Sequence, residues 1–261
     1  MGELDLNRAR FLNLAYAASV ESHQRFNIGT YKEKKLHRIL KQYFEDDSQY
    51  QEVPFAGFIA DIKNPDGIIE IQTSGFSSMR DKLEAFLPHC PVTVVFPTAQ
   101  KKWISWIDPV TGDISEKKRS PKKGRALDAA VEMVYILPYL HHPNLTVLVL
   151  LMEMDEYRLQ DGKRSPDGKR GSHRYERIPT DLFGAYSFHT PEDFAALLEP
   201  FPPEPFTAKQ LCTFLKYRGR AASALIRVLV EVGVLERCGK KGNAYLYRIA
   251  ETVRKNLTAP T

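Results

Sequence analysis

Three polar side chains on two β-like runs have the residue types and spacing of a metal site. Asp61 closes the apolar run 57–61, and Glu70 and Gln72 lie two residues apart in the run 68–73. Residues two apart on a strand share a face, so Glu70 and Gln72 point together while the neighbouring isoleucines point into a core. Mg²⁺-type ions prefer hard oxygen ligands. The pattern therefore predicts a metal site at one end of a sheet.

The connection between the two runs decides whether Asp61 and Glu70 share a face. Pairing 61 with 70 leaves Pro65-Asp66 as a two-residue connection between Asn64 and Gly67. Asn-Pro-Asp-Gly is a good tight-turn sequence, although a glycine bulge there can shift the register by one residue. The sequence allows this pairing without forcing it.

This pattern resembles the motif of the PD-(D/E)xK nuclease superfamily, in which an acid at a strand end precedes D/E-x-K on the next strand. Asp61, Glu70 and Gln72 match it, with glutamine where the family usually has lysine, although some members carry glutamine there. The resemblance implies that Asp61 and Glu70 hold Mg²⁺ or Mn²⁺ and that Gln72 orients a water. Lys101 or Lys102 could supply the positive charge that Gln72 lacks.

The segments around the motif follow the order of the nuclease core, which the resemblance covers from about residue 30 to 110. Apolar residues at helical spacing predict a helix over 31–44 and another over 77–87, and strands are expected at 49–55 and 92–96. Glu33 falls on or beside the apolar face of the first helix. It is either a further acid facing the metal, as in the family, or a helix N-terminal glutamate favoured by the macrodipole.

Beyond the core, the sequence predicts an α/β extension and then a second domain. A helix over 125–140 and an apolar strand over 145–152 are expected to extend the first sheet, and the proline-rich stretch 200–205 reads as a stiff linker or a helix stop. The expected fold is α/β, a restriction-endonuclease-like mixed sheet flanked by helices over 1–185. A small C-terminal domain follows over 190–261.

The C-terminal sixty residues resemble a winged helix-turn-helix domain. Thr207 and Gln210 have the spacing of a helix capping box, a second helix is expected over 220–232, and a basic turn at 239–243 joins two strand-like runs. The second helix would enter the major groove and the wing would touch phosphate. The residues expected to contact DNA are Arg220, Ser223 and Arg227 on the helix and Lys240, Lys241 and Tyr245 on the wing. Many such domains bind proteins instead.

Basic residues elsewhere are further candidates for DNA contact. Lys101 and Lys102 precede Trp103 and Trp106, which either stack on nucleic acid or, more often for tryptophans, pack against a neighbouring layer. Lys122 and Lys123 lie in the basic loop 116–125, which either contacts phosphate or is simply a solvated loop.

Composition is compatible with these expectations. The formal net charge of +5 and the pI of about 9.0 suit a polyanionic partner without requiring one. The three cysteines show no zinc spacing, and no apolar run is long enough to span a membrane, so a cytoplasmic protein is expected.

Three functions remain open. They are a metal-dependent DNA endonuclease, a non-catalytic DNA-binding protein on a degenerate nuclease fold, and an assembly protein whose winged helix docks a partner. Cutting both strands of a duplex takes two sites, which would suit a homodimer.

Overall fold

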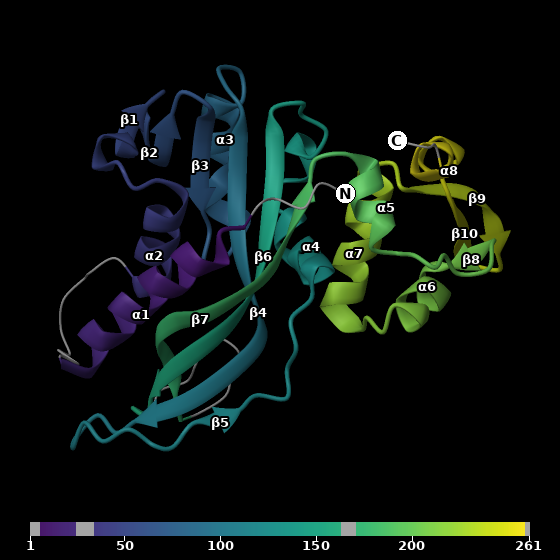
Figure 1. The fold of residues 1–261 in the computed structure, drawn as a ribbon. Helices are drawn as coiled ribbons and strands as arrows, with labels where there is room; N and C mark the ends of the chain where they lie inside the picture. Colours follow the sequence, from purple (N-terminus) through teal and green to yellow (C-terminus); the bar gives the residue numbers. More distant parts are fainter. Residues whose placement is uncertain (1–5, 25–33, 163–170, 259–261) are drawn as a thin grey trace.

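The fold is an α/β arrangement built on one mixed sheet. The computed structural model describes residues 6–24, 34–162 and 171–258 of the 261-residue chain (Figure 1). These residues form a seven-stranded sheet in the order β1-β2-β3-β4-β6-β7, with β5 paired to β4. The strands are β1 (Gln51–Phe55), β2 (Phe58–Asn64), β3 (Gly67–Ile71), β4 (Val92–Ile107), β5 (Lys118–Arg119), β6 (Leu145–Leu159) and β7 (His173–Phe188).

Strand direction explains why the sheet is buried at its centre. β1, β2 and β3 are joined as antiparallel neighbours, β3, β4 and β6 run parallel, and β7 returns antiparallel to β6. Parallel strands need coverage on both faces, which matches the continuous apolar run at the start of β6. The predicted α/β class with a mixed sheet and flanking helices is confirmed.

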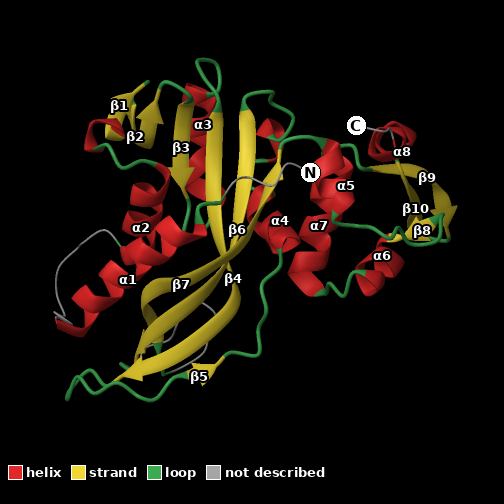
Figure 2. Ribbon diagram, in the orientation of Figure 1, coloured by secondary structure: helices red, strands yellow, loops and turns green. Residues whose placement is uncertain are grey.

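Helices cover the two faces of the sheet separately. One face packs against α1 (Arg8–Gln24) and α2 (Lys35–Phe44), around a core that includes Phe11, Leu40 and Ile71. The other face packs against α3 (Arg80–Phe86) and α4 (Ala130–Met133), around a core that includes Leu83 and Met133. Figure 2 shows these helices beside the yellow strands. Short 3-10 turns complete the layers: η1 (Ser48–Tyr50), η2 (Phe76–Met79), η3 (Ala126–Ala129) and η4 (Leu137–Tyr139).

Both helices predicted beside the motif are present. α2 buries the expected apolar positions Leu36, Ile39, Leu40 and Tyr43, because their spacing places them on one helical face. The second prediction, 77–87, corresponds to η2 followed by α3. The part of the first prediction before Lys34, including Glu33, lies outside the described residues.

Three predictions were wrong in extent. The strand expected over 145–152 continues to Leu159. Residues 125–140 are not one helix but the three short pieces η3, α4 and η4. The strand expected to end at 96 continues to Ile107 through Pro97. Val92 donates its backbone N–H to the Asn144 carbonyl, on the β6 side of the strand. Backbone N–H direction alternates along a strand, so at odd-numbered positions such as 97 the N–H would face the β3 side. β3 has already ended there, so the missing N–H of Pro97 removes no ladder hydrogen bond.

The three longest strands continue past the rest of the sheet as an extension, here called the arm. It comprises residues 101–107 of β4, 153–159 of β6 and 173–179 of β7, with β5 along the edge of β4. In Figure 1 the arm leaves the helical layers and carries β5 with it. Neither β7 nor α1 was predicted from the sequence.

The C-terminal residues form a smaller unit with its own sheet. Within the described chain, β8 (Phe206–Thr207), β10 (Ala244–Ile249) and β9 (Leu235–Lys241) pair antiparallel in that order. The accompanying helices are α5 (Pro191–Ala196), α6 (Ala208–Phe214), α7 (Gly219–Glu231) and α8 (Glu251–Thr258).

Side-chain contacts explain how this unit is capped and attached. The predicted capping box is confirmed: Gln210 N–H donates to Thr207 Oγ1, and Thr207 N–H donates to Gln210 Oε1. The apolar residues Leu225 and Val228 of α7 belong to the same continuous core as Met133 of α4. The C-terminal unit is therefore packed directly onto the first sheet's helical layer. Among the described residues, no helix is both long and apolar enough to cross a membrane.

Candidate active site

The β2–β3 hairpin places Asp61 and Glu70 next to each other. Its register pairs Ile62 with Ile69 and Asn64 with Gly67, as the proposed two-residue connection requires. Continuing this register places position 61 opposite position 70. Gly67 has φ +140°, and a Cβ there would lie 2.5 Å from the Pro91 carbonyl oxygen, so the turn requires glycine.

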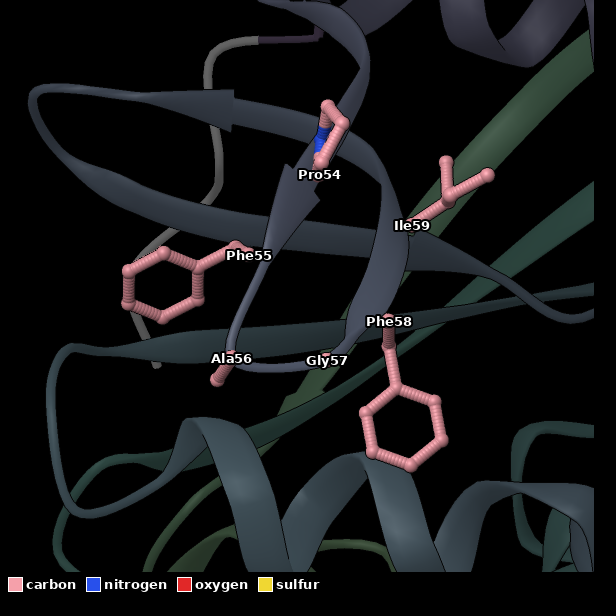
Figure 3. Close-up of a pocket in the computed structure, with 6 residues that line it drawn as sticks. All are labelled: Pro54, Phe55, Ala56, Gly57, Phe58 and Ile59. Atoms are coloured by element: carbon pink, nitrogen blue, oxygen red, sulfur yellow. The ribbon is translucent and has the colours of Figure 1, made fainter.

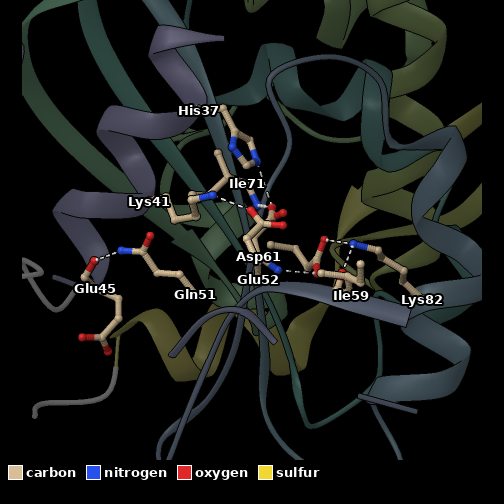
Figure 4. A network of polar contacts seen from close by, with 10 residues as sticks. His37, Lys41, Glu45, Gln51, Glu52, Ile59, Asp61, Ile71 and Lys82 are labelled. Carbon is tan, nitrogen blue, oxygen red and sulfur yellow. Dashed lines mark hydrogen bonds and ion pairs between the residues drawn. The ribbon is translucent and has the colours of Figure 1, made fainter. Parts of the chain in front are cut away.

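At Asp61 the two strands separate, and side chains replace the backbone ladder. The Ile71 N–H donates to Asp61 Oδ2 at 2.7 Å, and the Asp61 N–H donates to Glu70 Oε1 at 3.3 Å (Figure 4). Each carboxylate thus accepts a hydrogen bond from a backbone N–H of the other strand. This exchange holds both acids in fixed positions at the end of the hairpin.

Lys82 of α3 is the cation at Glu70. Glu70 is 0% exposed, and Lys82 Nζ lies 2.8 Å from its Oε2 and 2.8 Å from the Ile59 carbonyl oxygen. A buried carboxylate is costly unless it is paired and hydrogen-bonded. Lys82 therefore supplies the charge that Glu70 needs and ties α3 to the hairpin.

The two carboxyl groups titrate in opposite directions. Burial, followed by the negative charge of Asp61, raises the pKa of Glu70 to about 7, although Lys82 acts against the rise. Burial also acts to raise the pKa of Asp61. For Asp61, however, the hydrogen bond and charge of His37, the Ile71 N–H and Lys82 outweigh burial, and its pKa lies below the usual range. Asp61 is thus the permanent anion of the pair, and Glu70 is the group that titrates near neutral pH.

Two residues of α2 approach the hairpin from the other face. His37 Nε2 lies 3.1 Å from Asp61 Oδ2, and Lys41 pairs with Glu52 of β1 (Figure 4). The β1–β2 register pairs 51 with 62 and 53 with 60, which places Glu52 beside Asp61. Glu52 also has a left-handed backbone with φ 53°, which is uncommon for a glutamate. Glu52 of β1, Asp61 of β2 and Glu70 of β3 therefore occupy adjacent register positions across three neighbouring strands.

Sequence reasoning missed Lys41, Glu52 and Lys82. A signal for Lys82 was available, because it lies three residues after Met79 and four before Phe86, within the apolar stripe of its helix. A lysine in such a stripe needs an anionic partner. No comparable signal marked Glu52, which is defined by the strand register.

Unlike Lys82, neither Gln72 nor the two lysines expected at the site, Lys101 and Lys102, is recorded in contact with Glu70. The Gln72 N–H donates to the Val95 carbonyl at 2.9 Å, just beyond the end of β3. Lys101 Nζ lies 2.9 Å from a carboxylate oxygen of Glu153, and Lys102 Nζ lies 2.9 Å from one of Glu156. The expectation that Lys101 or Lys102 supplies the missing charge was wrong, because both are paired on the arm and Lys82 holds Glu70.

Within the described ranges, no three or more His, Cys, Asp or Glu side chains gather in a way that could hold a metal ion. Glu33, expected as a further acid, lies outside those ranges.

A hollow of about 500 Å³ lies near the site at the turn between β1 and β2 (Figure 3). It is lined by residues 54–59 and contains no ionisable side chain. Phe55 makes a tilted ring contact and Phe58 an edge-on ring contact with Phe86 of α3. Ile59 points away from both rings and is 55% exposed (Figure 3). This hollow therefore lies where the β1–β2 turn packs onto α3, and it is not part of the site formed by Asp61 and Glu70.

The candidate DNA contacts of the C-terminal unit are mostly exposed. Ser223 and Arg227 are exposed on α7, whereas Arg220 donates to the Tyr135 hydroxyl at 2.8 Å. On the β9–β10 hairpin, Tyr245 lies under Arg237 and Lys240, at 4.2 and 5.0 Å from its ring centre, and Lys241 is exposed. Lys122 and Lys123 are exposed in the basic loop. All three candidates of α7 are therefore exposed, and Arg220 also joins α7 to Tyr135 of the first sheet's helical layer.

The fold and this site define an α/β protein with an acidic pair on a β-hairpin. The chain belongs to the family described as "Domain of unknown function (DUF8091)", whose model matches residues 34–189. A curated relative described as "Uncharacterized protein", from Treponema pallidum (strain Nichols), is 28% identical over 230 residues, which cover 85% of this chain and 87% of the relative. No solved structure matches. The family match spans α2 to β7 and so includes the whole acidic site.

Proposed function

We propose that this protein is a metal-dependent endonuclease of the PD-(D/E)xK type that hydrolyses phosphodiester bonds in DNA. The observation that carries the proposal is the meeting of Asp61 and Glu70 where β2 and β3 separate, with Lys82 Nζ 2.8 Å from Glu70. Two neighbouring acids and one lysine are the residue types of the motif that the sequence resembles. The order α2, β1, β2, β3, α3, β4 is also the order expected of a restriction-endonuclease-like core.

Lys82 would take the role of the lysine that is absent at position 72. It reaches Glu70 from α3 rather than from β3, and its side chain keeps 23% of its surface exposed. An ammonium there can approach a phosphate while it favours the ionised form of Glu70. Gln72 would orient a water, but its amide carries no charge.

The donor set fits Mg²⁺ or Mn²⁺. Burial, and after it the charge of Asp61, raises the pKa of Glu70 to about 7, and a divalent cation beside the two carboxylates would offset both effects. Mg²⁺ commonly uses one or two carboxylates and completes its coordination with waters and substrate phosphates. Asp61 and Glu70 would hold the ion, which, when bound, would lower the pKa of a water and neutralise charge on the phosphate.

The residues around the acids would keep them oriented. The Ile71 N–H and His37 fix one oxygen of Asp61 from two directions, and Lys82 favours the charged form of Glu70 against its burial. Orientation by such partners is what makes metal-binding carboxylates effective.

The C-terminal unit supports the proposal as a winged helix that positions the enzyme on DNA. Helix α5, strand β8, helices α6 and α7 and the β9–β10 hairpin follow one another in the order expected of that domain. Lys240, Lys241 and Tyr245 would meet the DNA backbone from the hairpin. Arg220 would have to leave Tyr135 to reach DNA.

A non-catalytic DNA-binding role on the same fold has one observation in its favour. Glu70 is 0% exposed, and both of its oxygens and Asp61 Oδ2 accept hydrogen bonds from the protein itself. On that alternative, the acids and Lys82 would only join the hairpin to α3.

Cleavage of labelled duplex, single-stranded and branched DNA separates the two functions. We expect cleavage with Mg²⁺ or Mn²⁺ that stops in EDTA and falls about 100-fold or more in Asp61→Asn and Glu70→Gln. Lys82→Met should also lose activity, while Lys101→Met, which breaks an ion pair on the arm, should keep it. DNA binding without cleavage in all of these proteins would instead support the non-catalytic role.

A further inference from the structure

The arm has two chemically different faces. Residues directly opposite each other in a sheet share a face. The register pairs Trp106 with Arg158, Arg158 with Arg174, Glu156 with Arg177, and Ile104 with both Glu156 and Lys118. Lys102 reaches Glu156 and so lies on the same face. This face, here called the basic face, carries Lys102, Trp106, Lys118, Arg158, Arg174 and Arg177 around the carboxylate of Glu156.

Glu156 neutralises only part of that charge. Lys102 Nζ lies 2.9 Å from its Oε2, and Arg158 Nε lies 2.7 Å from its Oε1. These two cations outweigh the one carboxylate before Arg174 and Arg177 are counted. The basic face therefore has a surplus of positive charge at the centre of its strands.

Arg177 is the most constrained cation of this surplus. Its guanidinium donates to the Thr73 carbonyl oxygen. Burial, reinforced by the charge of Arg174, lowers the pKa of Arg177 to about 10, while Glu156 and Glu176 oppose the shift. Burying a cation next to another cation costs free energy, and an anion that binds between or beside the two lowers that cost.

The basic face begins beside the candidate active site and ends at an aromatic hollow. Thr73, which Arg177 contacts, follows Gln72 directly. At the far end, a hollow of about 380 Å³ is lined by Trp106 and Lys118, with Lys118 Nζ 6.0 Å from the Trp106 ring centre, and also by the carboxylates Asp108 and Asp113. An uncharged base would enter it more readily than a phosphate.

We infer that the basic face binds a single-stranded segment of nucleic acid next to the acidic pair. Arg158, Arg174 and Lys118 would contact its phosphates, and Trp106 would stack on a base, as in other single-strand binding grooves. The inference deepens the proposed function, on which it rests for naming the polyanion as nucleic acid. The inference also names Trp106, and not Trp103, as the tryptophan that stacks on a base of the bound strand.

The opposite face of the arm offers a matched control. There, Lys101 pairs with Glu153, Lys117 pairs with Asp155, and the Trp103 indole N–H donates to Glu153 at 2.6 Å. Lys101 and Lys117 each have their own carboxylate, and Arg119, opposite Trp103, adds one cation, so this face has a smaller surplus of positive charge than the basic face. Variants on the two faces can therefore remove equal charge from the same strands.

The test is fluorescence anisotropy with a 5′-labelled 20-nucleotide oligo-dT and a matched duplex, in EDTA so that no cleavage occurs. We expect Arg158→Ala/Arg174→Ala to weaken binding of the single strand about tenfold. The same double variant should reduce the slope of log K against log salt by about 1.4, because two phosphate contacts are lost. The double variant Lys101→Ala/Lys117→Ala should bind nearly as the native protein does.

The tryptophans give a second comparison that does not depend on charge. Trp106→Ala should weaken single-strand binding at least about fivefold, because stacking on that base is lost. Trp106→Phe should restore most of it, and Trp103→Phe should change little. Circular dichroism of each variant, compared with the native spectrum, checks that the fold is retained.

Three outcomes would overturn the inference. They are no single-strand binding by the native protein, equal losses in the two double variants, and a loss confined to duplex binding. Binding that follows the expected pattern in a protein that never cleaves DNA would instead refute the proposed endonuclease and leave the basic face in place.

Discussion

Replacing Lys82 by methionine should destabilise the protein in a way that depends on pH. Methionine keeps much of the side-chain volume but removes the charge and the hydrogen bonds to Glu70 and the Ile59 carbonyl. Lys82 lowers the pKa of Glu70 in the native protein, where that pKa is about 7. Without Lys82, the pKa of Glu70 must rise above 7.

The size of the effect follows from linkage between proton binding and folding. In unfolded chains Glu70 has its usual pKa of 4.5. Between that value and 7 the native protein binds the extra proton, so its free energy of unfolding falls as pH rises. In Lys82→Met this fall continues above pH 7, at about 1.4 kcal/mol per pH unit. The native protein, with its pKa of about 7, loses about 0.4 kcal/mol over the same interval, so the variant should lose up to about 1.5 kcal/mol more than the native protein between pH 7 and pH 8.5.

Urea unfolding of both proteins at several pH values from 6 to 8.5 measures this difference. Lys101→Met is the control, because its partly exposed pair with Glu153 should contribute about 0–1 kcal/mol with little pH dependence over this range. The double variant Lys82→Met/Glu70→Gln should remove the extra pH dependence, since no titrating group remains at position 70. A destabilisation by Lys82→Met that is the same at pH 6 and 8.5 would refute the reasoning.

Two further predictions concern the turn and the attachment of the C-terminal unit. Gly67→Ala should cost about 2 kcal/mol or more in urea unfolding, because its Cβ would lie 2.5 Å from the Pro91 carbonyl oxygen at φ +140°. Gly162→Ala, with open space around it, should cost clearly less, and equal losses would contradict the account. Arg125→Ala removes a 2.7 Å hydrogen bond to the Leu215 carbonyl and a guanidinium 3.7 Å from the Tyr217 ring centre. It should speed protease cleavage within 199–205, whereas the exposed neighbour Lys123→Ala should not, and an unchanged rate for Arg125→Ala would count against this contact as the attachment.

The parts of the fold that depend on local pattern could be predicted from the sequence. The Asn-Pro-Asp-Gly connection allowed the hairpin register that the structure shows, without forcing it, and the spacing of Leu36, Ile39 and Leu40 predicted α2. The Thr207 capping box specified the start of α6 for the same reason, since its partners lie within one turn. Each of these features is decided by residues close together in the chain.

The parts that depend on distant contacts could not be predicted. β7 is largely polar and half-buried, so it lacks an apolar run and is defined by pairing with β6. The split of 125–140 into short helices reflects packing of α4 against α7. The pairing of Lys101 with Glu153 depends on a neighbouring strand more than fifty residues away.

The candidate site divides in the same way. Asp61 and Glu70 could be brought together from the hairpin alone, whereas their partners come from other elements. Lys82 approaches from α3 on one face and His37 from α2 on the other. The sequence therefore predicts the acids but not the cations that set their pKa values.

The most direct test of the central claim is a time course of labelled-DNA cleavage by the native protein and Asp61→Asn, side by side in Mn²⁺. Asparagine keeps the size of Asp61 and an oxygen that can accept from the Ile71 N–H, but it removes the charge that would hold the ion. We predict defined products from the native protein, and at least about 100-fold slower cleavage by the variant at unchanged DNA affinity. Equal cleavage by both proteins, or none by the native protein with either metal, would contradict the assignment of Asp61 and Glu70 as a nuclease site.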